Sequence, residues 1–295
     1  MAATRNSAHS RLTCVPLLQN LHPDMGLVYF GEHCFDAFLI AFDKDGTLFD
    51  FHDNWRPRFL EAAERLLSRF SNQTEMQDAL FRTLGYNASD GTFGEDGPFA
   101  TATSDATAYA AATVLHQYSR PTLPWHQCEQ LVRLEFAPLL AEGFEPLAVT
   151  ELAPLFSSLH EHRVGVVVIT SDDRAPTEAM LAKFGLSRFV DYIGCGDSPG
   201  RHKPAPDQLL TAANLLDVSP AQSVVVGDSA ADLQMARAAG AGMAVGVLTG
   251  VGSRETLGPM ADVVLDSIAE IRVGVSPPDE RLREPDRSSD RPSEL

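Results

Sequence analysis

A short apolar run that ends in two aspartates constrains this chain more than any other feature. Residues 38–42 read Phe-Leu-Ile-Ala-Phe, and Asp43-Lys-Asp-Gly-Thr47 follows at once. A short apolar run closed by a turn residue is typical of a buried strand of a parallel sheet. Asp43 and Asp45 then stand at the carboxyl end of that strand, where open α/β sheets bind their ligands. Two carboxylates this close repel each other unless a cation lies between them or one of them keeps its proton.

Three later segments supply further polar groups of the kind that a phosphate site needs. Two of them are apolar runs, 164–169 and 223–226, and the third is a Pro-rich loop between the two. The groups that they carry are Thr170 and Ser171 after the first run, Lys203 in the loop, and Asp228 and Asp232 after the second run. Carboxylate oxygens are hard ligands that suit Mg²⁺, while Lys and Thr suit phosphate oxygens. The set therefore indicates a site for Mg²⁺ and a phosphoryl group.

In this order and spacing, the four segments resemble the four motifs of the haloacid dehalogenase superfamily, in particular its phosphoglycolate-phosphatase-like branch. The motifs of that family are Asp-x-Asp-Gly-Thr, a strand that ends in Thr or Ser, a Lys that often precedes Pro, and Gly-Asp-x-x-x-Asp. Residues 43–47, Thr170, Lys203 and residues 227–232 match them in turn. The resemblance spans roughly residues 36 to 270, and four motifs in order are far more specific than any one of them.

The resemblance implies a role for each aspartate. Asp43 would be the nucleophile that forms an aspartyl-phosphate, and Asp45 would protonate the leaving oxygen and then deprotonate the hydrolytic water. Asp228 would complete a Mg²⁺ shell together with the Asp43 carboxylate and the backbone carbonyl of Asp45. Asp232 would join that shell, although a favourable charge in the first turn of a helix is an alternative reading.

Four more residues are predicted to meet the substrate. Thr170 would bind the phosphoryl oxygens, with Ser171 as the alternative if the register shifts by one residue. Gly46, directly after the acid pair, is predicted with Ser171 to contact the substrate. Arg56 suits an anionic leaving group, but a role at the beginning of a helix explains it about as well.

The chain has only three lysines, namely Lys44, Lys183 and Lys203. Because Arg is used almost everywhere else, a Lys in the Pro-rich loop suggests that a compact point charge is needed there. Lys203 is therefore predicted to be the cation of the site. Lys44 lies between the two aspartates, and strand alternation predicts that its side chain points away from theirs.

The overall pattern predicts an α/β fold with a doubly wound, Rossmann-like parallel sheet as its core. The resemblance implies that the helical segment inserted after the first strand is an α-helical cap. Helical spacing of apolar residues dominates 51–148, and strands alternate with helices after residue 150. Helices are expected near 56–70, 74–84, 105–118, 125–142, 151–161, 175–184, 206–216 and 230–239, and strands near 164–169, 191–195, 223–227, 243–248 and 262–265. The expected divisions are an N-terminal extension (1–35), the core (36–50 and 149–272), the cap (51–148) and a disordered C-terminal tail (273–295).

The composition of the chain limits the kinds of partner and compartment that we expect for it. The formal net charge of −17 argues against nucleic acid, because phosphate backbones attract basic surfaces. No apolar run approaches the roughly 20 residues that a membrane span requires. The four cysteines lie far apart without zinc-ligand spacing or an evident disulfide framework, so we expect a reducing, cytoplasmic compartment.

These expectations combine into one function and two alternatives. The chain is expected to be a Mg²⁺-dependent phosphatase that hydrolyses a small phosphorylated metabolite, phosphoglycolate-like or a sugar phosphate, through an aspartyl-phosphate. A phosphomutase of the same fold also keeps both aspartates. A non-catalytic binding protein is the alternative of a different class, although it would not need Asp43, Asp45, Asp228 and Lys203 together.

Overall fold

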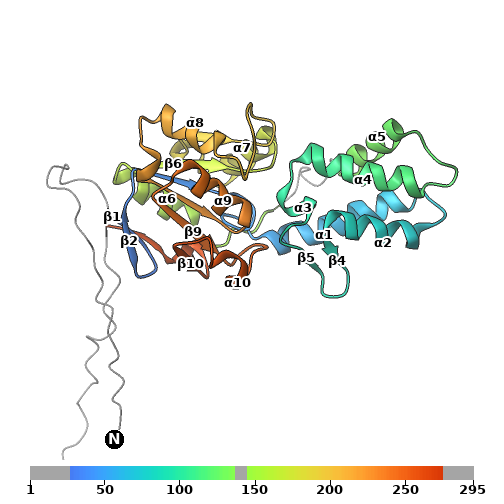
Figure 1. Cartoon of the computed structure of the whole chain (residues 1–295), viewed down its shortest axis with the longest axis horizontal. Helices are drawn as coiled ribbons and strands as arrows, with labels where there is room; N and C mark the ends of the chain where they lie inside the picture. The colour runs from blue at the N-terminus through green and yellow to red at the C-terminus, as the bar shows by residue number, and fades with distance from the viewer. Residues whose placement is uncertain (1–26, 137–144, 275–295) are drawn as a thin grey trace, which may run out of the picture.

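The computed structural model describes residues 27–136 and 145–274, and its centre is a six-stranded sheet (Figure 1). All neighbouring strands of this sheet are parallel. In spatial order the strands are β10 (Val263–Leu265), β9 (Met243–Val247), β8 (Ser223–Gly227), β3 (Leu39–Phe42), β6 (Gly165–Ile169) and β7 (Tyr192–Gly194). Each strand that the apolar runs predicted is present, because a strand covered on both faces must be apolar along its whole length.

The chain reverses its direction of travel across the sheet at β3. From β3 the chain continues to β6 and β7 on one side, and it returns to β8, β9 and β10 on the other side. The carboxyl ends of β3, β6 and β8 therefore meet at a topological switch point, where open α/β sheets leave a crevice for ligands. Asp43, Thr170 and Asp228 are the residues that directly follow these three strands.

Helices cover both faces of the sheet, as a doubly wound fold requires. One apolar cluster joins Ile40, Phe42 and Val226 to α6 and α7. A second cluster joins Leu39, Ala41 and Val225 to α8, α9 and α10 on the opposite face. These helices are α6 (Leu152–Glu161), α7 (Arg174–Lys183), α8 (Asp207–Leu215), α9 (Ala230–Ala239) and α10 (Arg254–Leu257). Since adjacent residues of β3 enter different clusters, the period-2 geometry of the strand separates the two halves of the core.

The elements between β3 and α6 form the helical cap. Figure 1 shows the cap at one end of the molecule and the central sheet with its covering helices at the other. The cap contains α1 (Phe51–Leu67), α2 (Gln73–Leu84), β4 (Tyr86–Asn87), β5 (Thr92–Phe93), α3 (Pro98–Thr101), α4 (Ser104–Tyr118) and α5 (Trp125–Phe136). These elements share a hydrophobic cluster of their own, in which Phe59 packs against Phe81, Tyr86 and Phe93. The cap is thus packed as a unit on its own apolar core.

Several boundaries differ from the sequence prediction for local reasons. Helix α1 begins near residue 51 rather than 56, because the Asp50 side chain accepts a hydrogen bond from the Asp53 amide (2.8 Å) and caps the helix. Between the predicted helices 74–84 and 105–118, where no element was expected, the chain forms the β4–β5 hairpin and α3. The predicted helix 125–142 is confirmed to Phe136, and its last part lies outside the described residues.

A three-stranded antiparallel sheet was not predicted. It consists of β1 (Leu27–Phe30), β2 (His33–Asp36) and β11 (Ile271–Val273) in the order β11-β1-β2. Strands β1 and β2 fall within the stretch that the sequence assigned to a peripheral extension, and β11 reaches the first residue of the predicted tail. Val28 and Phe30 are buried in the same cluster as α6, so this sheet adds to the covering of the core. The residue limits of the core, cap and tail stay predictions.

Two further findings concern the compartment. None of the helices within the described ranges is long and apolar enough to cross a membrane. Cys34 in β2 is disulfide-bonded, which the sequence analysis did not predict, whereas Cys128 and Cys195 are free and buried. A cytoplasmic location stays a prediction, and the disulfide does not support it.

Candidate active site

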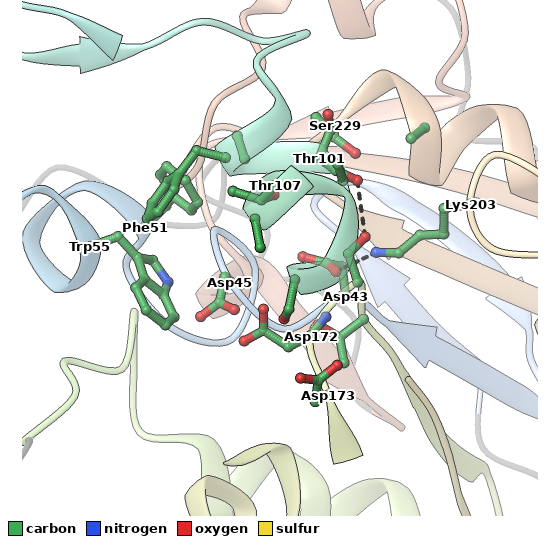
Figure 2. A pocket seen from close by; sticks show the side chains of 18 of the residues that line it. Asp43, Asp45, Phe51, Trp55, Thr101, Thr107, Asp172, Asp173, Lys203 and Ser229 are labelled. Carbon is green, nitrogen blue, oxygen red and sulfur yellow. Dashed lines mark hydrogen bonds and ion pairs between the residues drawn. The ribbon is translucent and has the colours of Figure 1, made fainter. Parts of the chain in front are cut away.

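The candidate site lies at the carboxyl edge of the sheet, under the cap. A cavity of about 330 Å³ opens there between the ends of β3, β6 and β8 and the helices α1, α3, α4 and α5. Figure 2 shows acidic side chains and Lys203 on one side of this cavity, with residues of the cap on the other. The residues that directly follow the three central strands all line it, as the switch point of the sheet predicts.

Lys203 joins two of the predicted aspartates. Its Nζ contacts an oxygen of Asp43 and lies 2.7 Å from Oδ1 of Asp232, and all three side chains are nearly buried. Burial alone would lower the pKa of the Lys203 ammonium, but the Asp232 and Asp43 carboxylates raise it. Lys203 therefore carries a fixed positive charge in this site.

Three carboxylates crowd around this one ammonium. Asp43, Asp228 and Asp232 each offer an oxygen, and these oxygens lie within 4.8 Å of one another. Burial raises the pKa of Asp43 to about 7 despite Lys203, and burial together with Asp43 and Asp232 raises the pKa of Asp228. The cluster thus holds more negative charge than Lys203 neutralises. Hard oxygen donors at this spacing suit a divalent cation.

Asp232 caps a helix, which is one of the two roles that the sequence left open, and it also lies in the acidic cluster. Its Oδ2 accepts hydrogen bonds from the backbone and hydroxyl of Ser229, which completes the capping box at the start of α9. Its Oδ1 accepts the bond from Lys203. The capping box fixes the rotamer of Asp232 and so holds Oδ1 toward the acidic cluster. The Asp45 carboxylate is not part of that cluster, and the role predicted for Asp45 toward a metal used its backbone carbonyl instead.

The prediction for Lys44 was wrong. Its ammonium is 1% exposed, contacts Oδ2 of Asp45 and lies 2.9 Å from Oδ2 of Asp172. Strand β3 ends at Phe42, and the Lys44 carbonyl accepts the Leu48 and Phe49 amides in a turn. The alternation of a strand therefore does not extend to Lys44, and its side chain folds back beside the acid pair. Lys44 thus buries one positive charge against two carboxylates.

The two carboxylate oxygens of Asp45 differ in their hydrogen bonds. Lys44 holds Oδ2, whereas Oδ1 is buried and has no hydrogen-bond partner within the described part of the chain. Burial raises the pKa of Asp45, against the lowering effects of Lys44 and of a hydrogen bond with Trp55. Figure 2 shows Asp45 between Trp55 and the end of β3. A buried carboxyl oxygen without a partner can carry a proton.

Thr170 and Ser171 both line the cavity, with different contacts. The Thr170 amide donates to the Gly194 carbonyl (2.8 Å), and its Oγ1 accepts from the Asp172 amide (3.1 Å). The hydroxyl of Ser171 donates to the Thr101 carbonyl in the cap (3.1 Å). Ser171 thus connects the core to the cap, whereas the hydroxyl proton of Thr170 has no acceptor assigned among these contacts.

Two predicted substrate contacts are not brought to the cavity. The Gly46 amide donates to the Phe49 carbonyl (2.7 Å), so it is already used within the turn. The Arg56 side chain is 45% exposed, lies 3.9 Å from Asp53 and extends beside Gly91. Neither residue is among those that line the cavity.

The sequence analysis missed a loop that holds Asp228. After β9, Thr249 donates to the Gly46 carbonyl (2.6 Å), and the Val251 amide donates to Oδ2 of Asp228 (2.8 Å). A Cβ added at Gly250 would lie 1.9 Å from that Oδ2, and one at Gly46, whose φ is +87°, would lie 2.4 Å from it. Both glycines are therefore needed for close approach. The run Thr-Gly-Val-Gly directly after a predicted strand was the only sequence signal for this loop.

Comparisons with known proteins agree with this geometry. The family model described as haloacid dehalogenase-like hydrolase matches residues 39–240. A plasmid-encoded phosphoglycolate phosphatase of Cupriavidus necator is 37% identical over 123 residues, which are 41% of this chain and 52% of that protein. The match thus spans about half of that relative's length.

Two other relatives are matched over more of their length. A fructose-1-phosphate phosphatase of Escherichia coli is 25% identical over 68% of this chain and 92% of its own. The crystal structure of CbbY from Rhodobacter sphaeroides in complex with phosphate aligns with a TM-score of 0.53 and 26% identity, over 79% of this chain and 96% of that one. The matched family model covers more than half of the chain and includes all four motifs, so the protein belongs to the haloacid dehalogenase-like hydrolases.

Proposed function

We propose that this protein is a phosphoric monoester hydrolase that transfers the phosphoryl group of a small metabolite to Asp43 and then to water. The observation that carries the proposal is the contact of Lys203 with both Asp43 and Asp232 at the switch point of the sheet. A cation fixed beside a carboxylate nucleophile attracts a phosphate to the place where that carboxylate can attack. The nucleophile, the cation and the cavity meet at one point.

Asp45 is the proton donor and acceptor in this proposal. The leaving oxygen takes a proton from Asp45 as its bond to phosphorus breaks, and the same carboxylate then removes a proton from the attacking water. Its partnerless Oδ1 and its raised pKa support this role. Lys44 and Trp55 hold the rest of the group in place.

The phosphoryl oxygens are bound by Lys203 and Thr170 in this proposal. Both line the cavity, Thr170 directly after β6 and Lys203 in the loop between β7 and α8. The Lys203 ammonium offsets negative charge, while the Thr170 hydroxyl can donate a hydrogen bond. Ser171 is the less suitable donor, because its hydroxyl already donates to the Thr101 carbonyl.

Mg²⁺ is the proposed cofactor, and the residues present fit it. Asp43, Asp228 and Asp232 offer oxygen ligands within 4.8 Å of one another, and the Asp45 backbone carbonyl is the further ligand that we propose. When bound, Mg²⁺ would offset the charge of the phosphoryl group and of the crowded carboxylates. Burial, together with the neighbouring carboxylates, raises the pKa values of Asp43 and Asp228.

The relatives support a small phosphorylated substrate. Two of them are named for phosphoglycolate and for fructose 1-phosphate, both of which are small phosphate monoesters. A phosphomutase of the same fold stays an alternative, as does a non-catalytic binding protein. Steady phosphate release from p-nitrophenyl phosphate with Mg²⁺ supports the hydrolase. Turnover only with a bisphosphorylated sugar activator would indicate the mutase, and no turnover of any phosphoester would leave the binding protein.

Activity is expected to disappear in EDTA and to return when Mg²⁺ is added in excess. Asp228→Ala is expected to raise the Mg²⁺ concentration for half-maximal activity by about tenfold or more, because a hard dication loses one of its few anionic ligands. The measurement is the initial rate with p-nitrophenyl phosphate over a Mg²⁺ titration. Full activity in the chelator would contradict the metal assignment.

Gly250→Ala is expected to lower kcat/KM for the same substrate by about a hundredfold, since a displacement of about 1 Å at a reacting group has that order of effect. The added methyl would overlap Oδ2 of Asp228 and force this carboxylate out of the acidic cluster. Gly94→Ala is the matched control, because a Cβ there meets only the Gly85 carbonyl at 3.6 Å. Equal activity of the two variants would contradict the role of the loop.

A further inference from the structure

Most of the residues on the cap wall of the cavity are apolar. Helices α1, α3, α4 and α5 each contribute to it. Its larger apolar side chains are Phe51, Trp55, Phe99, Val132 and Phe136. Thr101 and Thr107 are hydroxyl-bearing residues on the same wall, as Figure 2 shows. When the phosphoryl group lies beside Lys203, at the phosphoryl end of the cavity, the leaving group therefore contacts aromatic faces and a few hydroxyls.

The cations of the cavity are already paired. Of the residues that the structure describes, Lys203 and Arg133 are the only Lys or Arg that line it. Lys203 lies at the phosphoryl end with Asp43 and Asp232. The Arg133 guanidinium lies on the cap wall, 2.8 Å from Asp105 and 2.9 Å from Glu129. Two carboxylates for one guanidinium leave no net positive charge there for a second anionic group.

The border between the cap and the core is negative. Asp172 and Asp173 line the cavity on the side of β6, where Lys44 pairs with Asp172 but is shared with Asp45, so carboxylates outnumber cations there. Burial raises the pKa of Asp173, and so do the neighbouring carboxylates of Asp197, Asp172 and Asp105. A carboxylate or second phosphate on the leaving group would lie between this negative border and an apolar wall. It would lose its water without gaining a cation.

We propose that the substrate is the phosphate monoester of an uncharged alcohol or phenol whose apolar face packs on the aromatic wall, and that a second anionic group is selected against. The proposal rests on the proposed phosphatase function and deepens it. Aromatic side chains commonly bind the apolar faces of rings. The Thr101 and Thr107 hydroxyls donate to the Gly97 and Pro98 carbonyls, so their oxygens can accept hydrogen bonds from hydroxyls of the alcohol. Phosphoglycolate, whose leaving group carries a carboxylate, is then a poor substrate.

The test compares two matched pairs of esters with the Mg²⁺-loaded full chain. The first pair is phenyl phosphate and 4-carboxyphenyl phosphate, and the second is 2-hydroxyethyl phosphate and 2-phosphoglycolate. In each pair kcat/KM is expected to be at least about tenfold higher for the ester without the carboxylate. Equal or higher kcat/KM for the carboxylated members would overturn the proposal. A preference for 4-(aminomethyl)phenyl phosphate over phenyl phosphate would also overturn it, in favour of a cationic leaving group.

A double variant tests whether the pairing of Arg133 causes the expected preference for uncharged leaving groups. Asp105→Asn combined with Glu129→Gln removes both countercharges and leaves the guanidinium in place. The ratio of kcat/KM for 4-carboxyphenyl phosphate to that for phenyl phosphate is expected to rise by about tenfold, with phenyl phosphate turnover unchanged. An unchanged ratio would overturn the assignment of selectivity to the paired Arg133. Loss of all phosphate release from every ester by the unaltered protein would instead contradict the proposed function itself.

Discussion

Asp43→Asn is expected to abolish phosphate release while the fold stays intact. An amide of nearly the same shape cannot attack phosphorus, so no covalent intermediate can form. Loss of a nucleophile that acts together with its neighbours commonly lowers kcat by about a thousandfold or more. The measurement is steady-state hydrolysis of p-nitrophenyl phosphate at saturating Mg²⁺, with urea unfolding as the check on the fold.

Asp217→Asn is the matched control for this experiment. Asp217 is exposed, lies in the turn after α8 and has a φ of 54°, a conformation that Asn adopts readily. The same Asp-to-Asn change there should leave both activity and stability unaltered. If Asp43→Asn kept a tenth of the activity or more, which is about 1.4 kcal/mol of the barrier, another residue would be the nucleophile.

The strands of the central sheet could be predicted because β3, β6, β8 and β9 are buried along nearly their whole length. Runs such as 166–169 and 224–226 are apolar without interruption, and such runs are typical of strands that a parallel sheet buries on both faces. Their order along the chain, with helical segments between them, then favours a parallel sheet. The closeness of Asp43, Thr170 and Asp228 followed from the same logic, since parallel strands bring their carboxyl ends to one edge.

The strands that were missed depend on contacts far away in the chain. Val28 of β1 pairs with Val273 of β11, and the local sequence of neither short segment predicts this pairing. Strand β2 has one exposed residue and three that are half-buried, so it shows no clear alternation of apolar and polar residues. Short strands of this kind are decided by the tertiary structure rather than by their own sequence.

Two parts of the site were hidden for a related reason. The direction of Lys44 depends on where β3 ends, and a sequence pattern defines such boundaries only to within a few residues. The loop that holds Asp228 acts through the backbone amide of Val251. Because every residue except proline has such an amide, the residue type does not show which amide is used. Only the glycines of that loop, which allow a close approach, gave an indirect sign.

Lys44→Met is expected to lower the free energy of unfolding by about 3 kcal/mol, the order found when one partner of a buried ion pair is removed. The Met side chain fills a similar volume, but it leaves Asp45 and Asp172 facing each other without their shared cation. Burial alone would lower the pKa of the Lys44 ammonium, and Asp172 and Asp45 raise it instead, which indicates how strongly the charges depend on one another. Urea unfolding of the purified variant measures the loss.

Lys183→Met and a double variant separate this charge effect from a general effect of losing a lysine. The Lys183 side chain is 38% exposed and pairs with Glu145 at 2.7 Å, so its loss should change stability by less than about 1 kcal/mol. Adding Asp172→Asn to Lys44→Met removes one of the two stranded carboxylates and should restore part of the stability. A Lys44→Met variant as stable as Lys183→Met, or a double variant less stable than Lys44→Met alone, would show that the buried lysine is not needed to hold the two carboxylates together.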